Sequence, residues 1–255
     1  MPSRERQSSN RSILIALFAV IGLLIVADSL GREQKLERVS VTIIDSLSAD
    51  SEAEFTSSCV EFFFSAGYDV EVIGGSEVSV DRLKSIPSGC SALVMRVHSG
   101  VFEDSVWFFT GERYDSTRHV LEQLANEVHI ARATRGSDLF FAVGSSFVRR
   151  FMKEELEGAL VILMGCDGLA SPELAEAFLD AGAAVYVSWD GPVSLAHTDR
   201  ATLALLEGVT GGLTLEESVE RALRQVGPDV RYGSSLKIYP SEGAEFVLRG
   251  GQLRK

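Results

Sequence analysis

Short runs of consecutive apolar residues alternate along the chain with stretches in which apolar residues recur every three or four positions. The runs predict buried strands, and the spaced pattern predicts helices. The predicted strands cover residues 39–47, 68–73, 92–97, 139–143, 159–164 and 184–188, with a hairpin or extension at 106–110. The predicted helices cover residues 51–66, 80–86, 118–133, 171–181, 197–206 and 215–226, followed by a tail with two short strand-like pieces. This alternation indicates an α/β domain with a mostly parallel sheet and helices on both faces.

A more apolar segment precedes this pattern. Residues 13–27 read ILIALFAVIGLLIVA and contain no charged residue, and the flanks extend the segment to residue 30. That length suits a helix crossing a bilayer core of about 30 Å. Arg4, Arg6 and Arg11 precede the segment, so the positive-inside rule predicts a cytoplasmic N-terminus and an exported domain. The alternative is a signal peptide cleaved after Ala27, which exports the domain as well.

These features divide the chain into four parts. They are a cytoplasmic N-terminus at 1–12, a transmembrane anchor or signal peptide at 13–30, a polar linker at 31–37 and the α/β domain at 38–255. A domain of this size can bury a substantial core. The expected location is the cell membrane, with one span and the main domain outside the cytoplasm.

Charge and cysteine content narrow the classes of function. The formal net charge of −12 gives a polyanion little to bind, so a nucleic-acid partner is not expected. Three cysteines are too few for a disulfide scaffold in a chain of 255 residues, and their odd number suggests a free thiol. The sequence has no CxxC, HExxH or phosphate-binding glycine loop, so no metal or cofactor is expected.

Two residues with chemical potential follow predicted strands. His98 and Cys166 come directly after apolar runs, and glycines lie close to both, at Gly100, Gly165 and Gly168. Parallel sheets bind ligands at the carboxyl ends of their strands, where neighbouring strands lie about 4.8 Å apart. An imidazole can take the thiol proton, and the N-terminus of the helix that follows the cysteine can favour the thiolate. The alternative is a buried cysteine and a histidine that makes an ordinary hydrogen bond.

The surrounding motifs resemble a known superfamily. A strand ending in His-x-Gly and another ending in Gly-Cys-x-Gly are similar to the His and Cys blocks of the caspase-like superfamily, which includes caspases, gingipains, clostripain-like peptidases and CHAT domains. Residues 174–189, LAEAFLDAGAAVYVSW, also resemble the helix and strand after the cysteine in CHAT domains, and their Ser-Trp resembles the same strand end in caspases. The resemblance covers about residues 39–206. The chain also resembles uncharacterised archaeal membrane-anchored proteins. This second resemblance fits the predicted anchor but implies no activity.

This resemblance implies a fold and roles for particular residues. It implies a caspase-like fold with His98 as general base or acid, Cys166 as nucleophile, and the backbone N–H groups of Gly100 and Cys166 as oxyanion donors. Ser99 departs from these families, which usually place glycine directly after the histidine. The function expected is a membrane-anchored cysteine peptidase acting on a peptide or protein. The alternative is an inactive caspase-like fold that serves as a membrane-tethered binding or sensor module.

The resemblance also suggests a substrate. Caspases follow the Ser-Trp with an arginine that holds an acidic residue, whereas here Asp190 follows Trp189. The expectation is therefore a pocket for lysine or arginine, in which Asp190 pairs with the cation, Trp189 forms an apolar wall and Asp167 adds negative charge. The alternative is that Asp190 serves a turn through local backbone hydrogen bonds.

Overall fold

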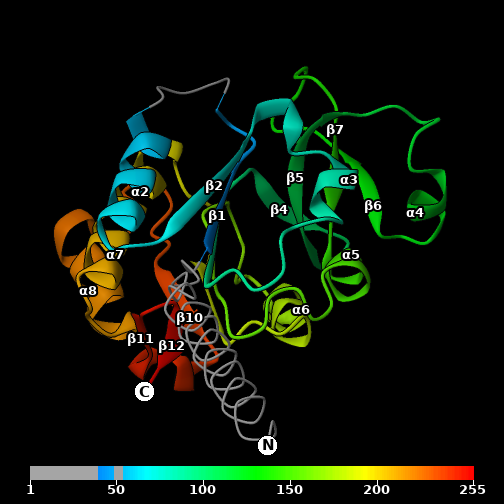
Figure 1. Ribbon diagram of the computed structural model, residues 1–255. Coiled ribbons are helices and arrows are strands. Elements are labelled where there is room, and N and C mark those ends of the chain that lie inside the picture. Colours follow the sequence, from blue (N-terminus) through cyan, green and yellow to red (C-terminus); the bar gives the residue numbers. More distant parts are fainter. Residues whose placement is uncertain (1–39, 49–53) are drawn as a thin grey trace, which may run out of the picture. The chain divides into compact units, whose positions relative to one another are not determined.

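The structure is a computed structural model that describes residues 40–48 and 54–255 (Figure 1). The predicted anchor and linker, at 13–30 and 31–37, lie outside these residues, as does the start of the first predicted helix. Within the described ranges, no helix is both long and apolar enough to cross a membrane.

A six-stranded sheet with the order β10-β9-β8-β3-β1-β2 forms the centre of the domain. Its strands are β1 (Ser40–Asp45), β2 (Asp69–Gly74), β3 (Ala92–Arg96), β8 (Leu160–Leu163), β9 (Val185–Trp189) and β10 (Leu236–Tyr239). All neighbouring strands run parallel except β10, which pairs with β9 in the antiparallel direction. Every residue of β3, β8 and β9 is buried, which explains why these strands are apolar apart from Arg96 and Ser188. The predicted α/β class with a mostly parallel sheet is confirmed.

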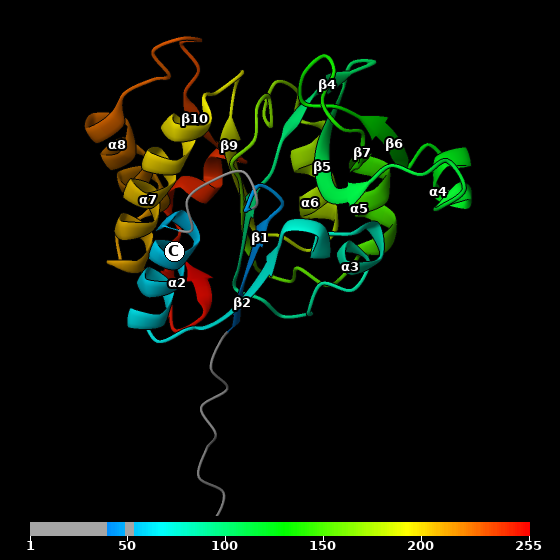
Figure 2. The same cartoon turned by 90° about the horizontal axis from the view of Figure 1, so that it is seen from above.

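Helices cover both faces of this sheet (Figure 2). One face carries α2 (Glu54–Ser65), α7 (Leu195–Thr210) and α8 (Leu215–Val226). The other carries α3 (Val80–Leu83), α5 (Ser145–Phe151) and α6 (Glu173–Asp180). Each set closes a separate apolar core, so the sheet is the shared wall between two cores.

A second sheet begins directly after β3 and was only partly predicted. It is antiparallel with the order β4-β5-β7-β6, formed by β4 (Ser99–Phe102), β5 (Ser105–Arg113), β7 (Phe140–Val143) and β6 (Val128–Ala131). Phe108, Phe141 and Val143 from one face of this sheet are buried in the core beside α5 and α6. The sequence predicted β7 and a hairpin at 106–110, but not the complete sheet.

The prediction of one helix over 118–133 was wrong. The structure has a short helix, α4 (Val120–Leu124), then Asn126 in a left-handed conformation with φ 57°, and then β6. Pairing of β6 with β7 supplies tertiary hydrogen bonds that a local apolar pattern does not reveal.

The C-terminal region after α8 contains a further small sheet. It holds a short 3-10 helix, η2 (Ser241–Glu245), and the hairpin strands β11 (Val247–Arg249) and β12 (Gln252–Arg254). A second 3-10 helix, η1 (Gly75–Glu77), directly follows β2. The tail therefore has three strands, β10 to β12, where the sequence predicted two strand-like pieces.

Candidate functional site

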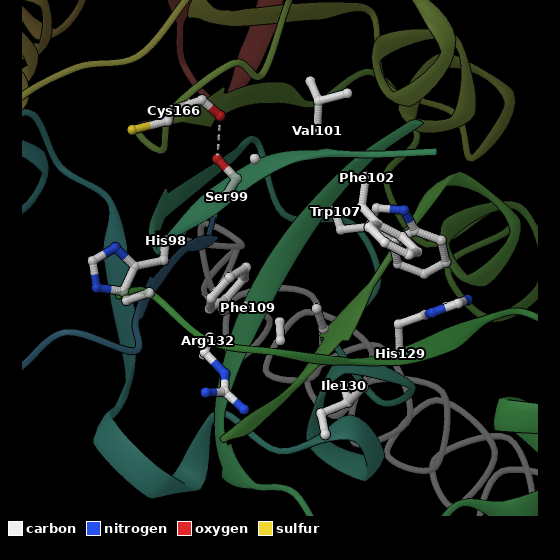
Figure 3. A pocket seen from close by; sticks show the side chains of 14 residues that line it. His98, Ser99, Val101, Phe102, Trp107, Phe109, His129, Ile130, Arg132 and Cys166 are labelled. Carbon is white, nitrogen blue, oxygen red and sulfur yellow. Dashed lines mark hydrogen bonds between the residues drawn. The ribbon is translucent and has the colours of Figure 1, made fainter. Parts of the chain in front are cut away.

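His98 and Cys166 lie beyond the carboxyl ends of two adjacent parallel strands, as the sequence predicted. β3 pairs directly with β8, from Ala92 opposite Leu160 onward. Both side chains line the same two pockets, one of about 410 Å³ and one of about 60 Å³. Figure 3 shows the larger pocket, with Cys166, Ser99 and His98 along one side of it. The histidine and the thiol therefore face a common space.

The loop that carries Cys166 is held by close packing at two glycines. Ser99 Oγ donates a hydrogen bond to the Cys166 carbonyl at 2.6 Å (Figure 3). A Cβ at Gly165 would lie 2.0 Å from Ser99 Oγ, and a Cβ at Gly168 would lie 2.0 Å from Ser188 Oγ. The missing side chains of these glycines thus leave room for two serine hydroxyls against the loop.

The thiol of Cys166 is half-buried and contacts the backbone of Val193. Its Sγ donates to the Val193 carbonyl at 3.5 Å and accepts from the Val193 N–H at 3.3 Å. Burial raises the pKa of the Cys166 thiol, the Val193 N–H opposes this, and the negative charges of Asp167 and Asp229 raise the pKa further. The expected stabilisation of a thiolate is therefore not found, and at neutral pH the thiol needs a base.

Asp229 is the more firmly charged of these two acids. Burial favours its neutral form, but the N–H groups of Ser194, Arg231 and Tyr232 donate to its carboxylate and lower its pKa to about 2. Asp167 behaves differently, because burial raises its pKa. The site therefore contains a carboxylate that stays charged throughout the neutral range.

The register of β4 against β5 determines in which direction the backbone N–H groups near His98 point. The Phe109 N–H donates to the His98 carbonyl at 2.8 Å, so these two residues form a hydrogen-bonded pair. Such pairs alternate along an antiparallel ladder, so Gly100 opposite Trp107 is also in a hydrogen-bonded position and directs its N–H to β5. Ser99 lies in the non-hydrogen-bonded position and directs its N–H to the open edge of β4.

The second expected oxyanion donor, Cys166, keeps its N–H available. This N–H makes no hydrogen bond to another residue in the described part of the chain. The Gly100 N–H is therefore directed to β5, whereas the N–H groups of Ser99 and Cys166 are not used by that strand.

The structure does not bring the expected substrate residues to the pockets beside Cys166. Trp189 is fully buried, and its Nε1 donates to Thr198 Oγ1 at 2.9 Å. Asp190 accepts from the Ser235 N–H at 2.8 Å and pairs with Lys237 at 3.7 Å. Neither residue lines either pocket, and neither does Asp167. Asp190 bonds to Ser235, 45 residues away in the chain, rather than within its own turn, and the pocket for basic side chains stays a prediction.

Two features of the site were missed by sequence reasoning. The first is a buried ion network next to His98, in which Arg96 pairs with Asp199 at 2.8 Å and with Asp45 at 3.2 Å. A charged residue at the end of an otherwise apolar run, as in VTIID and ALVMR, is the signal that was present for two of its members. The second is the aromatic wall of the larger pocket, where Trp107 meets His129 only because β6 forms.

The composition of the site gives no indication of a metal centre. Among residues 40–48 and 54–255, no group of three or more histidine, cysteine or acidic side chains is arranged to hold a metal ion. All three cysteines are free thiols, and Cys59 and Cys90 are buried. No protein-family model matches the sequence, and no curated protein matches it.

Proposed function

We propose that this chain is a membrane-anchored, caspase-like cysteine peptidase in which Cys166 is the nucleophile and His98 the general base. The observation that carries the proposal is that both side chains follow adjacent parallel strands and line the same two pockets. The His-x-Gly and Gly-Cys-x-Gly motifs at these two strand ends, together with the α/β fold, support membership of the caspase-like superfamily.

The raised pKa of Cys166 shapes the chemistry. The thiol proton passes to His98 as Sγ attacks the peptide carbonyl, because the thiol is protonated beforehand. The tetrahedral intermediate then collapses, the C–N bond breaks and His98 returns the proton to the leaving amine. Water hydrolyses the resulting thioester, which releases a carboxylic acid and restores the thiol.

The oxyanion donors in this proposal are the backbone N–H groups of Cys166 and Ser99. Ser99 occupies the position where caspase-like families usually place glycine, directly after the histidine. The register of β4 supports Ser99 because it directs this N–H away from β5. In this proposal the Ser99 N–H takes the place of the glycine N–H that these families use as an oxyanion donor.

The test uses a panel of internally quenched peptides and the full-length protein. Cys166→Ser and His98→Ala should each lower turnover by about 10² or more, since nucleophile and base act as a unit. Cys90→Ser is the matched control, because Cys90 is buried and lines neither pocket. Turnover that survives Cys166→Ser would contradict the proposal.

The location is proposed from the apolar segment and the three arginines before it. In this proposal the main domain lies outside the cytoplasm. A tag fused after Lys255 should be removed by protease added to intact cells. A protected tag would reverse this orientation, and release of a soluble domain would favour a cleaved signal peptide.

A membrane-tethered binding or sensor module is the second candidate function. It is favoured by the same thiol environment, because burial, Asp167 and Asp229 all oppose the thiolate. A peptidyl electrophile separates the two candidates. A peptidase should label rapidly at Cys166 and lose this labelling in His98→Ala, whereas a binding module should label slowly in both forms.

A further inference from the structure

The larger pocket lies on the outward face of the antiparallel sheet. Gly100 stands opposite Trp107, Phe109 opposite Ala142, and Ala142 opposite His129. Paired residues share a face, so these five residues line one surface drawn from all four strands. The pocket of about 410 Å³ opens on this surface and ends at Cys166.

Aromatic rings give this pocket an ordered wall. The Trp107 and His129 ring centroids lie 4.3 Å apart, and those of Phe102 and His129 lie 5.8 Å apart. Figure 3 shows these three rings together, across the pocket from Cys166. Gly144 packs against the indole, where a Cβ would lie 3.0 Å from the Trp107 ring. The wall is therefore fixed before any ligand arrives.

Trp107 also leaves a polar group without a partner. Its side chain is 7% exposed, and its Nε1 makes no hydrogen bond to any residue in the described ranges. Trp189, the other tryptophan of the chain, donates its Nε1 to Thr198. A buried indole N–H normally finds an acceptor, so Trp107 is an exception in this wall.

The charges around the pocket select against a basic ligand. No aspartate or glutamate lines it, and its one cationic side chain, Arg132, is exposed at the rim. This contrasts with the net charge of −12 for the whole chain. A lysine or arginine side chain would meet no counter-charge there, whereas a neutral ring would gain apolar contact.

The edge of β4 offers the backbone contacts that a peptide requires. β4 is an outer strand of its sheet, and Val101 and Phe102 are 51% and 52% exposed. Ser99 and Val101 occupy non-hydrogen-bonded positions opposite β5, so their N–H and C=O groups point outward. An added strand would pair with these groups and pass Cys166, whose carbonyl already accepts from Ser99 Oγ.

We propose that an extended peptide adds to the edge of β4 and places a large apolar side chain, best an aromatic one, in the pocket between Gly100, Trp107 and His129. The inference rests on the proposed function only in placing the cleaved bond next to this side chain.

Binding is measured with the full-length Cys166→Ala protein in nanodiscs, so that neither cleavage nor detergent interferes. The probes are acetylated pentapeptide amides with glycine at every position except the third, which is Phe, Ala, Asp or Lys. Calorimetry should show the Phe peptide binding about tenfold or more tightly than the Lys and Ala peptides, as burial of a ring predicts. Indole fluorescence should change as well, and this change reports Trp107 because Trp189 is fully buried.

Gly100→Val tests the position of the side chain. A Cβ at Gly100 meets no atom within 4 Å and its φ is not left-handed, so the substitution fills the pocket without straining the fold. It should weaken Phe-peptide binding about tenfold while leaving the melting temperature unchanged. Phe64→Ala, which removes an exposed ring on α2, is the matched control and should not alter binding.

Trp107→Phe should weaken binding a few-fold, because it keeps a ring but removes apolar area from the pocket wall. Equal affinity for the Phe and Lys peptides, or full binding by Gly100→Val, would overturn the inference. Cleavage of peptides without any preference for Phe would overturn it and leave the proposed peptidase standing. Selective binding of the Phe peptide by a protein that cleaves no peptide would support the inference and contradict the proposed peptidase.

Discussion

Cys166 is surrounded by groups that keep its thiol protonated. Burial is the largest cause, and Asp167 and Asp229 add negative charge. Asp167 has a left-handed backbone with φ 60°, a conformation that asparagine also tolerates well. The carboxylate can therefore be neutralised without disturbing the loop, which isolates its electrostatic effect.

Asp167→Asn should lower the pKa of Cys166, because it removes a like charge beside the thiolate. The rate of alkylation by iodoacetamide, followed against pH, gives the midpoint in each protein. Cys59 and Cys90 do not interfere, since both are buried and their pKa values are raised, that of Cys90 to about 11. Asp104→Asn is the matched control, because Asp104 also has a positive φ, of 63°. An unchanged midpoint in Asp167→Asn would show that its charge is screened.

The buried thiol of Cys90 should make the fold sensitive to alkali. Its pKa is about 11 in the folded state, mainly through burial, against an ordinary thiol pKa of about 8.5 in the unfolded chain. The folded state thus holds the proton more tightly, so stability is fully present below about pH 8.5 and falls as pH rises toward 11. About 3 kcal/mol should be lost across this window. Urea midpoints of the wild type and Cys90→Ala should converge as pH rises, and parallel curves would contradict this.

At the scale of the elements, the sequence predicted the strands that are buried on both faces. It did not predict a strand such as β6, whose conformation depends on pairing with a distant segment. β3, β8 and β9 are apolar apart from Arg96 and Ser188, so local sequence identifies them and places His98 and Cys166 at strand ends. β6 owes its conformation to pairing with β7, which lies outside any local window. The identity of the outward N–H groups on β4 depends on ladder register, so the choice between Ser99 and Gly100 needed the structure.

Gly165→Ala should destabilise the loop that carries Cys166. The new Cβ would meet Ser99 Oγ at 2.0 Å and the Val97 carbonyl at 2.8 Å, so the loop must move. We expect a loss of about 1–3 kcal/mol in the free energy of unfolding, measured with urea. Adding Ser99→Ala should recover part of this loss, because the contact with the Val97 carbonyl remains. Gly100→Ala is the control and should change stability by less than about 1 kcal/mol, since its Cβ meets open space. Equal losses in both glycine variants would refute the packing argument.

For the molecule as a whole, one buried cation joins three elements beside the site. Arg96 ends β3, Asp45 ends β1 and Asp199 lies in α7, and Arg96 is bonded to both acids. Thr56 Oγ1 of α2 donates to Asp45 at 2.6 Å. The network therefore fixes helices of one face against the strand ends that carry His98.

Arg96→Met should cost about 3–5 kcal/mol of unfolding free energy, because it leaves two acids without their buried partner. Asp199→Asn should cost less, since Arg96 keeps its bond to Asp45. Combining Arg96→Met with Asp45→Asn and Asp199→Asn should recover much of the loss, because no unpaired charge then remains. Urea denaturation at constant pH measures all three proteins. A triple variant no more stable than Arg96→Met would contradict this account.

The strand order also governs when the chain can fold during synthesis. β3 has β1 on one side and β8 on the other. Its second edge is therefore covered only after β8, which begins at Leu160, has been synthesised. The sheet is completed only when β10, at 236–239, joins β9. A nascent chain that stops before β8 exposes the unpaired backbone edge of β3 and offers it to other chains. Early fragments should consequently aggregate or be degraded, and the domain should become protease-resistant only when nearly all of it has left the ribosome.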